Sequence, residues 1–375
     1  MPQTTDPVWG VSPGDRRGSL PEQADVLVVG GGIAGVSTLW WLRQSGRSGV
    51  LVEADRLAFG ASGRNAGVIG SGPNRPYAAA VRDFGRARVA EITAFTLENH
   101  ERLVEALAGR SPNYRRRGGQ TWPVDGEEAA LLEESAELER EDGFGAEWNG
   151  RCLVHPHNGE HNPVETVLAL ASDAPEGSIR EGVRVTGLES SADGVLVETR
   201  DGGSCRAAAV VIALNAYTPQ LLPEVPIAPT RAQALATAPV AHQVAPCPQG
   251  RDHGYQYWNQ LADGRVVAGG YRNLAIPEEV GYEMAITPTL QSALERHLVG
   301  IEADQPVTHR WAGIMGFTEL GLPLVGPAPG RPNVYLCAGF TGHGFATSFL
   351  SARNLVRHLD GETSDPIVPW AALHS

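Results

Sequence analysis

The sequence predicts an α/β fold, α+β overall, in which a unit of alternating strands and helices encloses a second, mixed or antiparallel sheet. Two observations lead to this prediction. The chain opens with an apolar strand, a glycine-rich turn, an apolar helix and a second strand, and it closes with a strand, a glycine-rich loop and a helix. Between these ends lie strand-like runs separated by hairpin turn signals. The first domain is therefore expected to be discontinuous, with the second inserted into it.

The composition is that of an ordinary globular protein. Of its 375 residues, 42% are hydrophobic and 19% are charged. The net charge of −13 argues against a nucleic-acid partner. Four cysteines, Cys152, Cys205, Cys247 and Cys337, are far apart and form no C-x-x-C pair, which is typical of reduced thiols in the cytoplasm. The sequence contains no uninterrupted apolar run long enough to predict a membrane span.

The most informative motif follows the first apolar strand, residues 26–29. It has the spacing G-x-G-x-x-G, formed by Gly30, Gly32 and Gly35. Gly30 allows a tight turn, Gly32 lets the backbone approach a pyrophosphate, and Gly35 lets the helix over residues 33–44 pack closely on the sheet. This spacing is typical of dinucleotide-binding units when strand and helix flank it in this order.

Two further features support dinucleotide binding. The helix begins at Ile33 and Ala34, so its free N–H groups and the positive end of its dipole are available to phosphates. The second strand, residues 50–53, ends at Glu53, which lies 18 residues after Gly35. A carboxylate at this distance is expected to bind a ribose hydroxyl.

The remaining elements follow from hydrophobic periodicity, capping residues and turn signals. Helices are expected at residues 87–108, 127–141, 163–171, 288–299 and 344–359. Strands are expected at residues 184–188, 194–199, 207–213, 229–240, 254–271 and 333–338, with a turn at 262–264. Residues 54–76 are expected to form a loop rich in glycine.

Two glycine-rich loops favour FAD over NAD. The segment from Phe59 to Gly67 reads FGASGRNAG, and its small residues would let the backbone lie against a flat ring system, although a plain surface loop is the alternative. The segment from Gly339 to Phe345 reads GFTGHGF and stands directly before the last helix, where N–H groups suit a partial negative charge. A fold that binds NAD seldom needs a second such loop so far along the chain.

Taken together, these segments resemble the D-amino-acid oxidase-like, or glycine/sarcosine oxidase-like, family of FAD-dependent oxidoreductases over residues 24–362. The resemblance also rests on the segments His161–Pro163, Gly182–Val185, Val210–Tyr217 and Gly269–Arg272. The Arg-Asn-Ala-Gly and Asn-Ala-Tyr forms are most similar to the gamma-glutamylputrescine oxidase-like branch, which oxidises amines. The resemblance implies a Rossmann-like FAD-binding domain with an inserted substrate domain.

The domain boundaries predicted on this basis divide the chain into four parts. Residues 1–23 form an extended, polar lead-in, and residues 363–375 form a tail. The FAD-binding domain comprises residues 24–85, 150–225 and 310–362, and the substrate domain comprises residues 86–149 and 226–309.

The resemblance implies a set of cofactor-binding residues. Those at the pyrophosphate and the adenosine are Gly30, Gly32, Ile33, Ala34, Gly35, Glu53 and, through its backbone, Val185. Those on the pyrophosphate–flavin side are Ala61, Ser62, Arg64, Asn65, Ala66 and Gly67. Asn215, from the Asn-Ala-Tyr motif, is a further expected cofactor-binding residue. Those at the pyrimidine end of the flavin are Gly342, His343, Gly344 and Phe345, where N–H groups and the helix end would stabilise the anion of reduced flavin.

The sequence also departs from the family pattern. Members similar to sarcosine oxidase attach flavin through a cysteine in a Cys-Met-Tyr-Thr stretch, and the matching stretch here begins with Met315. Non-covalent FAD is therefore expected. A lysine that holds the substrate carboxylate is matched by Ala346, and a lysine that promotes reaction with oxygen aligns near Ala268. These changes argue against sarcosine-like substrates and efficient oxidase activity.

The expected reaction is oxidation of the C–N bond of an amine or amino acid, with hydride transfer to flavin N5 and formation of an imine. Positioning and desolvation dominate such chemistry, so no catalytic triad is expected. Arg272 is the candidate clamp for a substrate anion, with an intramolecular ion pair as the alternative. Tyr257, with Tyr255 and Trp258, could wall the pocket or form an aromatic core. His343 is a candidate base, but a structural or flavin-contacting role is favoured for it.

Alternatives remain at the level of the reaction. The same fold could oxidise the C–OH bond of a 2-hydroxy acid, or the chain could be a non-catalytic flavin-binding subunit. A metal site formed by His155, His157 and His161 is not expected, because Pro156 and an Asn-Gly pair interrupt them. The expected partners are a small amine or amino acid and an electron acceptor, oxygen or another, with the protein in the cytoplasm.

Overall fold

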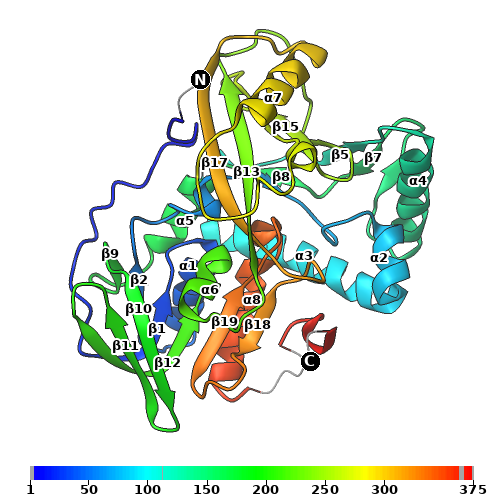
Figure 1. Ribbon diagram of the computed structural model, residues 1–375. Coiled ribbons are helices and arrows are strands. Elements are labelled where there is room, and N and C mark those ends of the chain that lie inside the picture. The colour runs from blue at the N-terminus through cyan, green and yellow to red at the C-terminus, as the bar shows by residue number, and fades with distance from the viewer. Residues whose placement is uncertain (1–3, 112, 363–366, 374–375) are drawn as a thin grey trace.

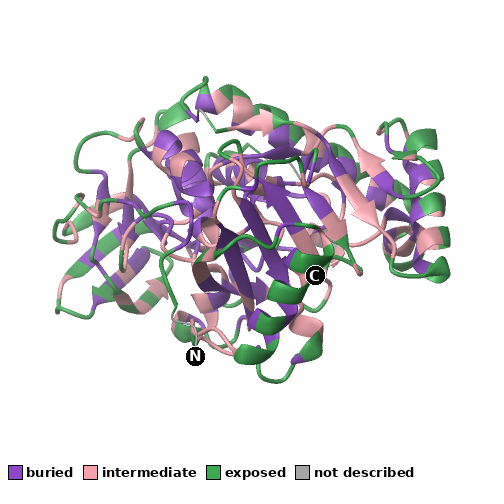
Figure 2. Cartoon of the chain, turned by 90° about the horizontal axis from the view of Figure 1, so that it is seen from above, coloured by how far each residue is buried: buried purple, intermediate pink, exposed green. Residues whose placement is uncertain are grey.

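The computed structural model describes residues 4–111, 113–362 and 367–373, and Figure 1 shows two large sheets with helices packed around them. Each large sheet has eight strands, and a third, small sheet has three. The small sheet is formed by β3 (Val68–Ile69), β8 (Gly159–Glu160) and β4 (Arg115–Arg116). Figure 2 shows that buried residues are concentrated on the central strands and exposed residues on the outer faces of helices.

The first large sheet has a parallel centre. Its central strands are β12 (Ser204–Ile212), β1 (Gln23–Val29), β2 (Gly49–Glu53), β9 (Ile179–Glu181) and, beside the second half of β12, β19 (Val334–Ala338). The antiparallel strands are β10 (Val185–Ser191), β11 (Gly194–Thr199) and β18 (Leu324–Pro327). The carboxyl ends of β1, β2 and β12 therefore lie at one edge, where ligands bind in sheets of this kind.

Four helices cover this sheet or join it to the rest of the molecule. They are α1 (Ile33–Gln44), α3 (Arg86–Leu107), α5 (Pro163–Ala171) and α8 (Gly344–Leu359). Helix α8 packs against both α1 and α3, as Figure 1 shows. Asn99 of α3 is fully buried and fixes this contact, since its amide donates to the Phe345 carbonyl at 2.9 Å and accepts from the Leu350 N–H at 3.0 Å.

The second large sheet runs in the order β17, β13, β16, β15, β14, β5, β7 and β6. Its strands are β17 (Val307–Phe317), β13 (Ala228–Thr237), β16 (Val266–Gly270), β15 (Gln256–Gln260), β14 (Gln249–Arg251), β5 (Gly119–Trp122), β7 (Leu153–His155) and β6 (Glu147–Trp148). Helix α7 (Pro288–Gly300) packs on β13 and β16, and a core of Leu235, Val266, Leu294 and Leu298 lies between them. We call the face under α7 the outer face and the opposite face the inner face.

At the far end of this sheet, α4 (Gly126–Glu141) packs on β6 and β7, and α2 (Tyr77–Phe84) packs on α4. The short α6 (Thr218–Leu221) follows β12. The N-cap residue of α4 is Asp125, whose side chain accepts the Glu128 N–H. The N-cap residue of α5 is Asn162, whose side chain accepts the N–H groups of Val164 and Glu165. These caps explain why both helix starts could be predicted from the sequence.

The predicted α/β fold is confirmed, and most elements lie within a few residues of their predicted ends. Helix α1 and helix α5 match their predictions residue for residue, and the predicted strand at 254–271 is the β15–β16 hairpin. The sequence reading missed β17, which pairs with β13 over ten residue pairs from Ala228–Phe317 to Thr237–Val307. It also missed α2, the small sheet and the strands β5, β6, β7, β9, β14 and β18.

The division into domains stays a prediction, but two elements bear on its boundaries. Residues 310–317, assigned above to the FAD-binding domain, lie in β17 of the second sheet. Helix α3, assigned to the substrate domain, packs along α8. The lead-in is extended, as expected, but it buries Val8 and Trp9, and the Trp9 indole donates to the Asn65 carbonyl at 2.8 Å.

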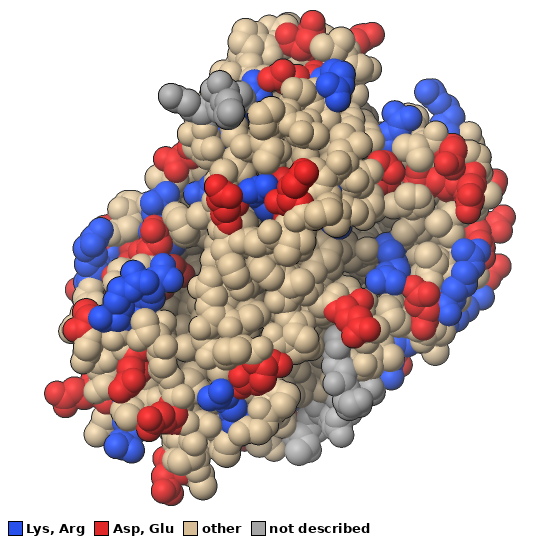
Figure 3. Space-filling model, viewed as in Figure 1, with Lys and Arg blue, Asp and Glu red and all other residues tan. Residues whose placement is uncertain are grey.

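Charged residues of both signs are mixed on the face of the molecule that Figure 3 shows. They are interspersed around an uncharged centre. Within the part of the chain that the structure describes, no helix combines the length and the apolar character that crossing a membrane requires.

Candidate active site

The turn between β1 and α1 is packed so closely that its glycines are required. Gly30 has a φ of +116°, and a Cβ on it would lie 2.6 Å from the Ala213 carbonyl oxygen. A Cβ on Gly35 would lie 1.9 Å from the Gly30 carbonyl oxygen. Helix α1 can therefore approach the strand only because residue 35 has no side chain, which keeps its N-terminus against the end of β1.

The N-cap residue of α1 is Gly32, which has no side chain and so forms no side-chain hydrogen bond to the start of the helix. The Ile33 N–H donates to the Ser62 hydroxyl at 2.9 Å, which brings the predicted loop at 59–67 to this helix end. The Glu53 carboxylate accepts the N–H groups of Gly31 at 2.7 Å and Asp55 at 2.8 Å. Burial raises the pKa of Glu53, and the two N–H donors oppose this effect by stabilising the carboxylate.

The 59–67 loop is braced from within and against the second sheet. The Asn65 amide donates to the carbonyls of Ala61 and Ser62, and its oxygen accepts the Gly67 N–H. The Arg64 guanidinium donates to the carbonyls of Phe59 at 2.9 Å and Ala312 of β17 at 3.1 Å. Arg64 and Asn65 therefore shape the loop through side chains, while Ala61, Ala66 and Gly67 contribute small, closely packed positions. A Cβ on Gly67 would lie 2.6 Å from the His161 carbonyl oxygen.

The 339–345 loop lies beside the same region. The Asn215 side chain accepts the N–H groups of Gly339 and Phe340, both at 3.0 Å, so Asn215 positions this loop. His343 Nε2 lies 3.1 Å from the Gly72 carbonyl oxygen, and burial lowers the pKa of His343, which favours a neutral ring that donates to that carbonyl. This contact supports the structural reading of His343.

Phe345 and Val185, two further predicted cofactor-binding residues, lie in different parts of the molecule. The Phe345 ring is buried and meets the His161 ring edge-on at 4.4 Å between centroids. Val185 begins β10, opposite Thr199 of β11, in the first sheet. Gly342 is in close approach to β17, since a Cβ on it would lie 3.4 Å from Met315 Sδ. Met315 therefore faces the loop, as expected for the position matched to a flavin-linking cysteine.

Arg272 lies two residues after β16, at the start of a short 3₁₀ helix (Arg272–Leu274), and has an unusual setting. Its guanidinium carbon lies 4.6 Å from the Tyr255 ring centroid and 4.8 Å from the Phe317 ring centroid. No carboxylate in the described ranges lies within ion-pair distance of it. Two aromatic faces therefore hold a half-buried cation whose N–H groups are left for another acceptor. The ion pair considered as the alternative is not formed with any described residue.

Tyr257 and Trp258 face opposite sides of the second sheet. Tyr257 lies across the inner face, where a Cβ on Gly269 would meet its ring at 2.3 Å. Burial raises the pKa of Tyr257 to about 12, so it stays protonated. Trp258 is buried on the outer face, 4.7 Å from the His297 ring. The interpretation of Trp258 as a wall of the same pocket is therefore wrong, because side chains alternate along a strand.

Two of the histidines considered as metal ligands have different partners. His155 contacts Glu139 at 3.3 Å, whereas His161 contacts Thr166 at 2.8 Å.

The two positions matched to family lysines are both buried. Ala346 is buried in α8, and Ala268 is buried on the outer face under α7. A side chain at position 268 would therefore point away from the two glycine loops. The whole chain contains no lysine, so no other position supplies the family lysines.

Residues 25–358 match the family described as "DAO: FAD dependent oxidoreductase". The chain belongs to this family of FAD-dependent oxidoreductases. It is 26% identical to gamma-glutamylputrescine oxidoreductase of Escherichia coli K12, in a match that covers 90% of this chain and 84% of that protein. The predicted resemblance, including a relative from the named branch, is confirmed.

Two solved structures show the same fold. Glycine oxidase from Geobacillus kaustophilus superposes with a TM-score of 0.76 at 20% identity, covering 92% of this chain and 96% of that one. The L-alpha-glycerophosphate oxidase from Mycoplasma pneumoniae, solved with FAD bound, gives a TM-score of 0.72 at 17% identity and covers 91% and 95%.

The residues present fit FAD. The packed Gly30–Gly35 turn and the start of α1, whose N-cap residue Gly32 has no side chain, suit a pyrophosphate, and Glu53 stands at the end of β2, as the resemblance implied. The loops braced by Asn65 and Asn215 are rich in small residues and adjoin the same end of the first sheet. The individual cofactor contacts assigned above from the resemblance remain predictions.

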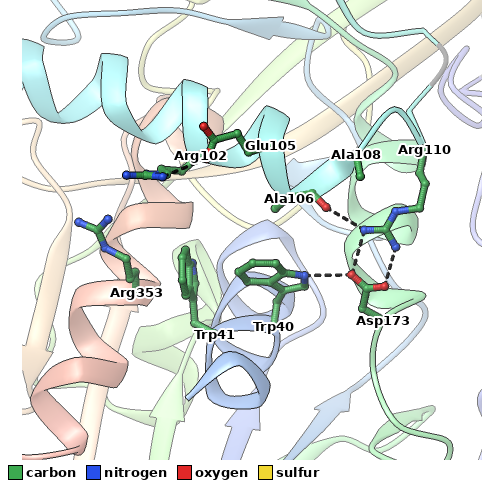
Figure 4. A pocket seen from close by; sticks show the side chains of 9 residues that line it. All are labelled: Trp40, Trp41, Arg102, Glu105, Ala106, Ala108, Arg110, Asp173 and Arg353. Carbon is green, nitrogen blue, oxygen red and sulfur yellow. Dashed lines mark hydrogen bonds and ion pairs between the residues drawn. The ribbon is translucent and has the colours of Figure 1, made fainter. Parts of the chain in front are cut away.

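A surface pocket of about 770 Å³ lies elsewhere (Figure 4). Trp40 and Trp41 of α1 line it beside α3 and α8. Its arginines are each paired, as Arg110 with Asp173 at 2.7 Å and Arg353 with Glu98 at 2.9 Å illustrate. It therefore offers an anionic substrate no free cation, unlike the surroundings of Arg272.

The sequence reading missed several residues that shape the inner face. Phe317 holds Arg272, and the Trp311 indole donates to the Arg64 carbonyl at 2.9 Å. Both lie on β17, which has no clear alternation of polar and apolar residues. Asn259 lies two residues beyond Tyr257 on the same face, and the alternation Tyr255, Tyr257, Asn259 was a signal available in the sequence.

Proposed function

We propose that the protein oxidises the C–N bond of an amine or amino acid that carries an anionic group. The observation that supports this most directly is the Arg272 guanidinium, held between two rings and without a carboxylate partner in the described residues. The names of the relatives, gamma-glutamylputrescine oxidoreductase and glycine oxidase, support an amine as the group oxidised. FAD, when bound, supplies the acceptor for the hydride that leaves the carbon next to nitrogen.

The side chains near the inner face then bind and orient. Arg272 holds the substrate anion through charge-assisted hydrogen bonds, and Tyr255 and Phe317 keep its guanidinium in one plane. Tyr257 remains neutral and excludes water from one wall of the site. The reaction needs the neutral amine, and His343 is committed to the Gly72 carbonyl, so we assign no general base among these residues.

A hydroxyl substrate is the second candidate. The structural neighbour named L-alpha-glycerophosphate oxidase has this fold, and an arginine clamp would hold the anion of a hydroxy acid as readily as that of an amino acid. A flavin-binding subunit without turnover is the third candidate.

The absence of lysine favours an electron acceptor other than oxygen, because the oxygen-promoting group implied by the family is a lysine. The cytoplasmic location also stays a prediction, and all four cysteines are free and buried.

The test is an anaerobic substrate screen that follows flavin absorbance near 450 nm. Amines and amino acids with a carboxylate should bleach the flavin, whereas their 2-hydroxy analogues should bleach it much more slowly. Faster bleaching by hydroxy acids would replace the first candidate with the second. No bleaching by either class, in protein that dithionite reduces normally, would favour the third.

Flavin attachment provides a separate prediction. The position matched to the flavin-linking cysteine is Met315, and burial raises the pKa of the nearest candidate thiol on the C-terminal strands, Cys337, to about 12, so this thiol stays unreactive. Acid precipitation of the purified yellow protein should release all the flavin into the supernatant. Colour that remains in the pellet after washing would contradict non-covalent binding.

A further inference from the structure

Two neighbouring amides on β15 have opposite environments. Gln260 is buried, and its side chain accepts the Val244 N–H at 2.8 Å and donates to the His242 carbonyl at 2.9 Å. Asn259 is even more buried, at 1% exposure, yet neither its Nδ2 nor its Oδ1 has a hydrogen-bond partner among the described residues. One strand thus carries a fully paired amide on one face and a fully unpaired amide on the other.

Asn259 is an exception among the buried amides of this chain. The other five in the described ranges each form hydrogen bonds through both side-chain polar atoms: Asn99, Gln233, Gln249, Gln260 and Gln291. Burying an amide without partners is unfavourable, because hydrogen bonds to water are lost and not replaced. The Asn259 amide therefore requires a partner that is not part of the protein chain.

The inner face around Asn259 is bounded on one side by the 59–67 loop. Strand pairing places Tyr257, Gly269, Ala234 and Trp311 in one row across four strands. Trp311 ends this row with its bond to the Arg64 carbonyl. The next row, Asn259, Val267 and Ala236, lies on the same face.

The other side of the face is bounded by the segment that contacts His343. Thr121 and Gly250 continue the row of Tyr257, so Gly119 lies on the inner face two residues before Thr121. A Cβ on Gly119 would lie 2.7 Å from Asn158 Nδ2, and Asn158 Oδ1 accepts the Ser71 hydroxyl at 2.8 Å. Ser71 precedes Gly72, whose carbonyl contacts His343. Asn259 therefore faces the region between the two loops assigned to the flavin.

We propose that the Asn259 amide is a second substrate-binding group, which pairs with a neutral hydrogen-bonding group at the end of the substrate remote from the anion. This proposal rests on the proposed function, because Arg272 defines the anionic end. Asn259 lies four positions after Tyr255, which stacks on Arg272, so the two backbone positions lie about 13 Å apart at the usual rise of a strand. An extended amino acid with a distal amide or hydroxyl could reach both, whereas glycine could not.

The first test concerns stability and does not depend on turnover. Asn259→Leu replaces the unpaired amide with an apolar side chain of similar volume, so the melting temperature of the holoenzyme should stay equal or rise. Gln260→Leu, the matched control on the adjacent residue, removes paired hydrogen bonds and should lower the melting temperature by several degrees. A comparable fall in both variants would overturn the proposal, since it would show that bound water pairs with Asn259 as a structural group.

The second test concerns specificity. Nε-acetyllysine carries a distal amide, and 2-aminononanoate is its apolar analogue of the same length. In the anaerobic bleaching assay, the wild-type protein should prefer Nε-acetyllysine by at least about tenfold, the value of one well-formed hydrogen bond. Asn259→Leu should lose this preference through a higher KM with little change in kcat, and Asn259→Asp, which keeps an acceptor, should retain part of it.

The outcomes separate this proposal from the proposed function. Equal bleaching by both amino acids in the wild-type protein would overturn the role of Asn259 and leave amine oxidation intact. If neither amino acid nor any other amine bleaches the flavin, the proposed amine chemistry fails, and Asn259 as an amine-substrate group fails with it. In that case the stability comparison still shows whether the unpaired amide is a structural requirement.

Discussion

Gly35→Ala is expected to deprive the protein of FAD. The new Cβ would lie 1.9 Å from the Gly30 carbonyl oxygen, a contact between backbone groups that no side-chain rotation relieves. Helix α1 must then move away from β1, which displaces the helix start that faces the pyrophosphate. Overpacking of this kind costs about 3 kcal/mol or more, which corresponds to an FAD affinity lower by about 100-fold.

The measurement is the ratio of flavin absorbance to protein absorbance after purification, followed by titration with FAD. Gly126→Ala is the matched control, because Gly126 begins α4 and a Cβ there meets nothing within 4 Å. It should retain full flavin content. Far-UV circular dichroism distinguishes loss of cofactor from loss of fold. A Gly35→Ala protein with normal flavin content and affinity would contradict the close packing described for the turn.

Arg272→Met is expected to weaken binding of anionic substrates strongly. Methionine keeps an apolar chain that can lie between Tyr255 and Phe317, but it removes the charge-assisted hydrogen bonds to the substrate. Such bonds are worth about 1.5–3 kcal/mol, so KM for a carboxylate-bearing amine should rise about 10- to 100-fold. The flavin spectrum and the melting temperature should change little.

Steady-state kinetics with two substrates make this prediction specific. The KM for an amine without a carboxylate, such as benzylamine, should be almost unaffected by Arg272→Met. Arg251→Met is the control for loss of one positive charge on the same sheet, since Arg251 lines a pocket on the outer face with Trp258. An unchanged KM for carboxylate-bearing amines in Arg272→Met would exclude the clamp, whatever the control shows.

Local signals made much of the first sheet predictable. The β1–α1–β2 unit, Glu53 and the capped helix α5 each depend on residues close together in the sequence. The same holds for α8, whose predicted range, residues 344–359, matches the structure. Phe345, Phe349, Ala352 and Val356 follow one another at helical spacing and are buried, and Leu359, the next position at this spacing, is partly buried. Family membership followed from the order of such motifs along the chain.

Strand β17 could not be predicted in this way. It contains two glycines, a methionine and an arginine among its eleven residues, without regular alternation. It is a strand because its backbone pairs with β13, whose paired residues lie from 70 (Thr237 and Val307) to 89 (Ala228 and Phe317) positions earlier, and this pairing is a property of the folded chain. The partners of Arg64 and Arg272 on β17 were missed for the same reason.

The sequence by itself determined the dinucleotide motif and the FAD-dependent family, whereas it placed Tyr257 and Trp258 together, in one pocket wall or in an aromatic core. Because side chains alternate along a strand, two adjacent residues face opposite sides of a sheet, but this rule does not say which residue faces which side. The tertiary structure decided that Tyr257 faces the glycine loops and Trp258 faces α7. It also decided that Arg272 lacks an ionic partner and Asn259 lacks hydrogen bonds within the described chain. Whether a polar group is paired depends on residues that are distant in the sequence, and only packing brings those residues together.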